Sequence, residues 1–170
     1  APSFEEDALE VLTAKANLRV LSAERPDGRR FDLRPIDGGM LVQTTDDVPV
    51  DIEHWSVVTD AKPTDEQWDD IKFAWQVCAA VSSNAVVYAK DRQAFGIGAG
   101  QQNRLDSSRI AAERSAGRAE GGVCASDAFF PFRDGLDAAV EAGIRAVVQP
   151  GGSVRDDEVI AAANEAGIAM

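Results

Sequence analysis

Apolar positions along the chain follow a helical period in some stretches and form short continuous runs in others. The clearest helix is predicted to begin after Pro63-Thr64, where Thr64 and Gln67 have the spacing of a capping box. Apolar residues then recur at steps of three and four: Trp68, Ile71, Trp75, Cys78 and Val81. This spacing predicts that one face of the helix is buried, with the tryptophans in the core.

The rest of the second half alternates strand and helix with short connections. Continuous apolar runs predict strands at 85–89, 94–97, 123–126 and 146–149. Helices are predicted at 104–115, with Leu105, Ile110 and Ala111 facing inward, at 136–142 and at 156–166. Gly143 and Gly167 close the last two helices. Such alternation predicts a parallel or mixed sheet that is covered on both faces.

The first sixty residues give a different pattern. Ser3 and Glu6 have capping-box spacing and predict a helix over 4–15. Strands are predicted at 18–22, 31–36, 40–44 and 55–59, with a turn at 26–28 and a polar loop at 46–53. The strands at 31–36 and 40–44 surround Gly38-Gly39, which predicts a hairpin.

Composition narrows the class of protein. A chain of 170 residues supports one domain with a core, and its net charge of −12 argues against nucleic acid or an anionic membrane as a partner. No apolar run approaches the roughly 18 residues that span a membrane, and no signal peptide opens the chain. Two distant cysteines and a single His, His54, favour neither a disulfide framework nor a structural zinc site. The cytosol is the expected compartment, and His54 is expected at the surface.

The segment from Ser126 to Asp134 carries the strongest candidate chemistry. It is predicted to join a strand to a helix that begins near Asp134, a position where ligands bind in open α/β sheets. Phe129 could stack on a flat ring while Arg133 or Asp134 bonds the edge of that ring. A phenylalanine-rich corner of the core explains the same residues equally well.

Three further motifs have weaker signals. Asn84 could grip a carboxamide or an amine, although a turn residue is the commoner role of Asn. Glycines at 96, 98 and 100 let the backbone approach a ligand or a neighbouring strand, and Arg104 then opens a helix where an anion is favoured. The spacing is not that of the dinucleotide fingerprint. The loop at 150–157 is interpreted as a tight connection without a ligand.

In this order, the segments 83–85, 96–104, 126–134 and 149–158 resemble the C-terminal part of the AICAR transformylase/IMP cyclohydrolase family. The resemblance is close over 73–170 and looser from Ala1. It implies a three-layer α/β/α fold with a mixed sheet, like that of cytidine deaminase. Residues 1–170 would form a single domain, the second of two such units in the transformylase region.

The resemblance implies formyl transfer from 10-formyltetrahydrofolate to aminoimidazole carboxamide ribonucleotide (AICAR) in the synthesis of inosine monophosphate (IMP). It also implies a cytoplasmic homodimer, with a potassium ion near the Ser-Asn segment. Asn84, the catalytic candidate, is similar to the Asn that contacts the nucleotide near the reacting amine. Arg104, Phe129 and Asp134 match residues that line the folate and reaction pocket.

The chain also departs from the family pattern. The family's catalytic Lys-His pair belongs to the first unit, and its last strand and terminal His would follow Met170. The chain is therefore expected to be a fragment that lacks these parts and the cyclohydrolase domain, and to be inactive alone. The deaminase zinc signature is absent, which argues against deamination. The alternative is a non-catalytic deaminase-like module that binds a nucleotide or a partner subunit.

Overall fold

The computed structural model of the protein describes residues 1–24, 28, 31–45, 50 and 52–170. Contacts within the chain divide it into two units, Ala1–Asp47 and Val48–Met170. Each unit is described by itself. In the described ranges, none of the helices has both the length and the apolar character needed to cross a membrane.

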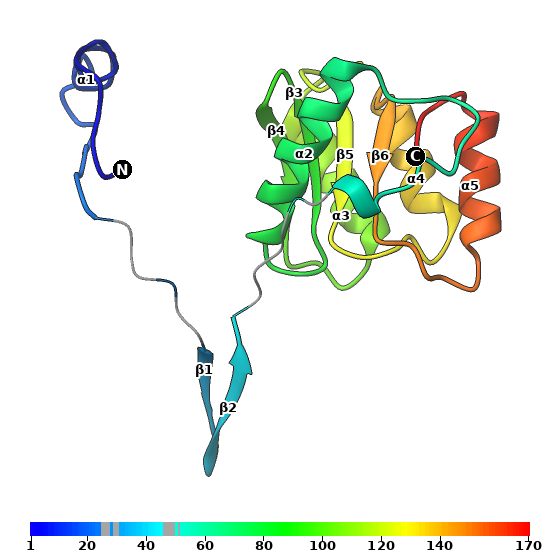
Figure 1. Ribbon diagram of the computed structural model, residues 1–170, viewed down its shortest axis with the longest axis horizontal. Helices are drawn as coiled ribbons and strands as arrows, with labels where there is room; N and C mark the ends of the chain where they lie inside the picture. The colour runs from blue at the N-terminus through cyan, green and yellow to red at the C-terminus, as the bar shows by residue number, and fades with distance from the viewer. Residues whose placement is uncertain (25–27, 29–30, 46–49, 51) are drawn as a thin grey trace. The chain divides into compact units, whose positions relative to one another are not determined.

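The second unit is built on a four-stranded mixed sheet with the strand order β4-β3-β5-β6 (Figure 1). Strand β3 (Val86–Lys90) is antiparallel to both β4 (Gln93–Gly98) and β5 (Val123–Ser126). Strand β6 (Ala146–Val148) is parallel to β5. All four strands lie where the apolar runs predict them, to within one residue at each end.

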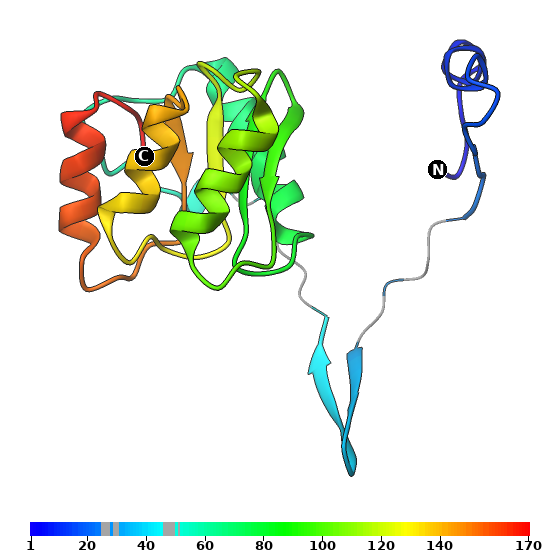
Figure 2. The same cartoon turned by 180° about the vertical axis from the view of Figure 1, so that it is seen from behind.

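Helices cover both faces of this sheet, as Figures 1 and 2 show from opposite sides. Helix α2 (Asp65–Ala79) lies on one face, and α3 (Arg104–Ser115), α4 (Arg133–Glu141) and α5 (Asp156–Glu165) lie on the other. Side chains alternate along β3, so that Val87 packs in the cluster with Ile71 of α2, while Val86 packs in the cluster with Leu136 of α4. The predicted α/β fold with a mixed, doubly covered sheet is confirmed.

Helix α2 begins as its capping signal predicts. The hydroxyl of Thr64 accepts a hydrogen bond from the backbone N–H of Gln67, and the Gln67 side chain accepts one from the Thr64 N–H. Ile71 and Cys78 are buried as predicted. Trp68 and Trp75 are only half-buried, because they line a pocket rather than fill the core.

Helix α3 has the predicted bounds but a different buried face. Leu105 and Ile110 are half-buried, whereas Ala111 and three serines are buried: Ser107, Ser108 and Ser115. The cause is the close approach of β4, since a Cβ on Gly98 would overlap the carbonyl oxygen of Ser107. A Cβ on Gly96 would overlap that of Ala111 in the same way. These two glycines therefore serve packing against a helix, not the predicted approach to a ligand or a strand.

In the first unit, strand β1 (Phe31–Ile36) pairs antiparallel with β2 (Gly39–Thr44), and Gly38 in the turn has a φ of 76°. The predicted hairpin is confirmed. Helix α1 (Glu6–Thr13) is shorter than predicted, and the Ser3–Glu6 capping box is wrong. Its N-cap is Glu5, which makes no side-chain capping bond.

Two predicted strands are wrong, because neither finds a ladder partner in the part of the chain that the structure describes. Residues 18–22 form no strand. Residues 55–59 follow a short 3₁₀ helix, η1 (Ile52–His54), and the backbone N–H of Val58 donates to the Met170 carbonyl at 2.9 Å. Most of the predicted turn at 26–28 and most of the predicted loop at 46–53 lie outside the described residues, and residues 52–53 of that loop belong to η1.

Candidate functional site

Three of the predicted site residues lie at one edge of the sheet, where strands begin or end. Strands β4, β5 and β6 point in the same direction, so the loops that follow them meet at one edge, together with the start of β3. Asn84 precedes β3, Arg104 begins α3 after β4, and Phe129 lies in the loop after β5. Ligands bind at this edge in open α/β sheets.

Arg104 is the centre of a polar cluster at this edge. Its guanidinium donates to the Asn84 side-chain oxygen at 2.8 Å, to the Ser126 hydroxyl at 3.2 Å and to the Asp127 carboxylate at 2.9 Å. We call these four residues the Arg104 cluster. The structure thus joins two predicted site residues, Asn84 and Arg104, that lie on opposite sides of β3 and β4 in the sequence.

The partners of Arg104 are themselves held by the backbone. The Asn84 side-chain amide donates to the Gln101 carbonyl at 2.8 Å, and the main chains of these two residues also bond to each other. The Asp127 carboxylate accepts a second bond, from the Ala85 N–H, at 3.0 Å. Each side chain is therefore fixed before any ligand binds, as preorganised sites require.

The cluster retains donors that a ligand can use. A guanidinium has five N–H bonds, of which the contacts above use three, and the Asn84 amide keeps its second N–H. The Arg104 and Asp127 side chains are 12% and 17% exposed, so a ligand could reach only a small part of each. Because the pair is neutral as a whole, it suits an amide or a carbonyl better than a lone anion.

The phenylalanine run divides between the two roles that the sequence left open. Phe130 is fully buried, and its N–H donates to the Gln149 side chain at 2.7 Å, so this residue is a corner of the core. Phe129 is exposed and can stack on a ring. Phe132 is also exposed, and the Arg155 guanidinium lies 4.7 Å from its ring centre.

Asp134 lies in the first turn of α4 and does not join the Arg104 cluster. It is not the helix cap, which is Phe132, and its carboxylate accepts from the N–H of the next residue, Gly135, at 2.7 Å. The side chain is exposed and lines a shallow surface groove of about 450 Å³ beside Arg109 of α3. Arg133, the other residue predicted to bond the edge of a ring, pairs with Asp137 and Glu165 instead.

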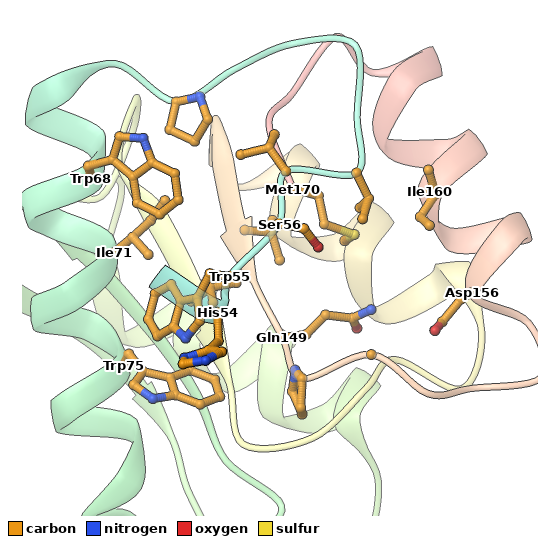
Figure 3. A pocket seen from close by; sticks show the side chains of 17 residues that line it. His54, Trp55, Ser56, Trp68, Ile71, Trp75, Gln149, Asp156, Ile160 and Met170 are labelled. Atoms are coloured by element: carbon orange, nitrogen blue, oxygen red, sulfur yellow. The ribbon is translucent and has the colours of Figure 1, made fainter. Parts of the chain in front are cut away.

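An aromatic pocket of about 340 Å³ was missed by the sequence reasoning (Figure 3). The rings of Trp55 and Trp75 meet edge to face at 5.5 Å on one side, beside His54. Gln149 and Asp156 lie on the other side. One Asp156 oxygen accepts from the Gly152 N–H at 2.7 Å, and the other is buried without a partner among the described residues.

The pocket bears on three predictions. The two tryptophans of α2, predicted to lie in the core, are half-buried and line the pocket, because helical spacing does not reveal a half-buried face. His54 also lines the pocket, but it is exposed, so its predicted position at the surface is confirmed. Pro150 and Gly151 of the loop at 150–157 line the pocket too, and its description as a tight connection without a ligand stays a prediction. Gln149 connects the pocket with the phenylalanine loop through its bond to Phe130.

The described residues offer little support for a reactive cysteine or a metal site. Within the described residues, no group of three or more His, Cys, Asp and Glu side chains could hold a metal ion. Cys78 and Cys124 are both buried, in the clusters on opposite faces of the sheet. Burial raises the pKa of the Cys78 thiol to about 12, so this thiol stays protonated and unreactive near neutral pH.

Comparison with known proteins places the chain in a family. The sequence pattern of the AICARFT/IMPCHase bienzyme family matches residues 1–114. The chain belongs to this family. The matched range includes Asn84 and Arg104, and it runs through the hairpin of the first unit as well.

Individual relatives extend the similarity over the whole chain. The bifunctional purine biosynthesis protein PurH of Xylella fastidiosa is 53% identical over 174 residues, which are 100% of this chain and 33% of that protein. The PurH proteins of Nostoc punctiforme and Anoxybacillus flavithermus are each 48% identical over the whole chain, and 33% and 34% of their lengths are covered. The chain therefore spans about one third of the length of these curated relatives.

Proposed function

We propose that residues 1–170 are the second deaminase-like unit of the transformylase region, the C-terminal part of the family's bifunctional protein. Family membership and a mixed sheet between two helical layers support this assignment. The cytidine-deaminase-like fold and the division of the transformylase region into two deaminase-like units belong to the proposal.

The proposed reaction of the parent protein is formyl transfer to AICAR in purine biosynthesis. The 5-amino nitrogen of AICAR attacks the formyl carbon of 10-formyltetrahydrofolate, and a new C–N bond forms. The bond from that carbon to N10 of the folate breaks, and the proton that the amine loses passes to N10. Such a step needs donors fixed at the developing oxyanion and close placement of two large substrates.

The convergence of Arg104 on Asn84, Ser126 and Asp127 is the observation that carries this proposal. Asn84 would bind the nucleotide near its reacting amine, and Arg104 would hold the Asn84 amide in one orientation. Phe129 would stack on a substrate ring. Asp134 would accept hydrogen bonds from the amino-pyrimidine edge of the folate.

We also propose the setting that the resemblance implies: a cytoplasmic homodimer of the parent protein, with a potassium ion near Ser83 and Asn84. The chain alone is proposed to be inactive. The sequence contains one His, His54, which follows a Glu, so the chain has no Lys-His pair to exchange protons with the substrates.

A second candidate function is a non-catalytic module in which the Arg104 cluster only locks a loop to a helix. The observation in its favour is that Asp127 already neutralises Arg104, while both side chains are largely covered. A structural lock and a substrate site predict different kinetics when Asn84 is changed.

The test uses a protein in which this chain replaces the matching third of the Nostoc punctiforme PurH; we call it the exchange chimera. Asn84→Ala in the exchange chimera is expected to lower kcat of formyl transfer about a hundredfold, the effect of losing one positioned polar group. Gln102→Ala, at an exposed residue of the neighbouring loop, is the matched control and should leave kcat unchanged. Unaltered kcat in a folded Asn84→Ala chimera would favour the structural lock.

A further inference from the structure

The pairing of β1 with β2 sorts the hairpin side chains onto two unlike faces. Directly opposed residues share a face, because side chains alternate along each strand. One face carries three opposed pairs: Phe31 with Thr44, Leu33 with Val42, and Pro35 with Met40. We call this set the apolar hairpin face. The other face carries Asp32 with Gln43, Arg34 with Leu41 and Ile36 with Gly39, so half of its residues are polar and two of them are charged.

Nothing described in the first unit covers the apolar hairpin face. The side chains of Phe31, Leu33, Met40 and Val42 are 54–59% exposed. Helix α1 has no buried residue either, so the described part of this unit has no core. A two-stranded hairpin is marginal by itself in water, and an exposed apolar face of this kind is typical of a docking surface.

We propose that the apolar hairpin face docks on a folded surface in the part of the family protein that this chain does not match. The relatives are about three times as long as the chain, and the family match runs through the hairpin. The hairpin would form one layer of this contact and the covered surface the other, and the apolar hairpin face would be buried between them. This proposal rests on family membership and does not depend on formyl transfer.

The size of the face favours this occupant over a second copy of the chain. A stable interface between separate molecules needs roughly 20–30 residues a side. The apolar hairpin face offers six residues. Within one covalent chain a small contact suffices, because linkage raises the effective concentration to roughly the millimolar range or above.

Hydrogen–deuterium exchange of the hairpin amides tests the proposal without a catalytic readout. The amides of β1 and β2 are expected to exchange about tenfold or more slowly in the exchange chimera than in the 170-residue chain. Val42→Asp in the chimera should restore fast exchange. Leu41→Asp is the matched control, since Leu41 has a similar exposed fraction, 56% against 59%, on the opposite face, and it should keep the protection.

Three outcomes would overturn the proposal. Equal exchange in the wild-type chimera and the 170-residue chain would show that the rest of the family protein does not cover the face. Protection that rises with the concentration of the 170-residue chain would identify a second copy as the occupant. Protection lost equally in Leu41→Asp and Val42→Asp would mean that the apolar face is not the docking side. The wild-type comparison stays decisive even where a variant does not fold.

Discussion

Replacing Arg104 by Met tests whether the Arg104 cluster is a tightly coupled unit. Met keeps an apolar stem but removes three hydrogen bonds, to Asn84, Ser126 and Asp127. The Asp127 carboxylate, 17% exposed, then retains one backbone donor, the N–H of Ala85. Removing one partner of a buried ion pair costs about 3–5 kcal/mol. Because Asp127 keeps this donor, we expect the free energy of unfolding to fall by about 3 kcal/mol, the lower end of that range.

Urea unfolding of the 170-residue chain, followed by tryptophan fluorescence, measures this loss. All three tryptophans lie in the second unit, so the signal reports on the unit that contains the cluster. Arg109→Met, on an exposed position of the same helix, is the matched control and should change the free energy of unfolding by no more than about 0.5 kcal/mol. The m-value should stay constant in both variants.

A double variant separates charge from packing. Adding Asp127→Asn to Arg104→Met removes the unpaired carboxylate, so the double variant should be more stable than Arg104→Met alone. Two results would refute the reasoning: a loss below about 1 kcal/mol in the free energy of unfolding of Arg104→Met, or strictly additive effects of the two changes. Either result would mean that the Arg104 guanidinium is hydrated in the folded protein and not tightly coupled to its partners.

The remaining predictions concern Asp134, Gly98 and Cys78, with Gly39 as a control position. Asp134→Asn in the exchange chimera should weaken antifolate binding by about 1.5–3 kcal/mol in calorimetric titration and spare AICAR, because an amide replaces one acceptor oxygen with a donor; equal losses for both ligands would indicate a folding defect. Gly98→Ala should destabilise the second unit by about 2 kcal/mol or more in urea unfolding, since its Cβ would overlap Ser107. Gly39→Ala, whose Cβ would meet Ile36 at 3.9 Å, should have no effect on that transition. Burial raises the pKa of Cys78 from 9.0 to about 12, so only the unfolded chain loses this proton in between, and the urea midpoint should fall as pH rises through that window. The fall should be shallower in a Cys78→Ala variant, where only buried groups such as Cys124 and Tyr88, whose pKa values burial also raises, still contribute; an equally steep fall would contradict the prediction.

The second unit was predictable because its signals are local. Strands β3, β5 and β6 are short apolar runs that are almost fully buried, and β4 is a short apolar run that is partly exposed. Helix α2 carries its own capping box at Thr64 and Gln67. The buried serine face of α3 was not predictable, because it depends on how closely Gly96 and Gly98 approach from another strand. The strand expected at 18–22 failed for a related reason: a strand needs a partner, and β-propensity alone does not provide one.

The candidate site was predictable in part. Asn84, Arg104 and Phe129 could be singled out as polar or aromatic residues at strand ends, and the first two indeed meet. The ion pair between Arg104 and Asp127 joins residues that are far apart in the sequence, so no sequence motif predicts it. The aromatic pocket escaped because Trp68 and Trp75 have the spacing of a core face, and only their half-buried state reveals an opening.

The most direct test of the proposed function is the rate of formyl transfer from 10-formyltetrahydrofolate to AICAR by the wild-type exchange chimera. If this chain is the second deaminase-like unit of the transformylase region, kcat should remain within about tenfold of that of the Nostoc punctiforme PurH, a difference of about 1.4 kcal/mol in activation free energy. The 170-residue chain alone should show no turnover in the same assay. A folded chimera that no longer transfers the formyl group, or turnover by the isolated chain, would contradict the proposal.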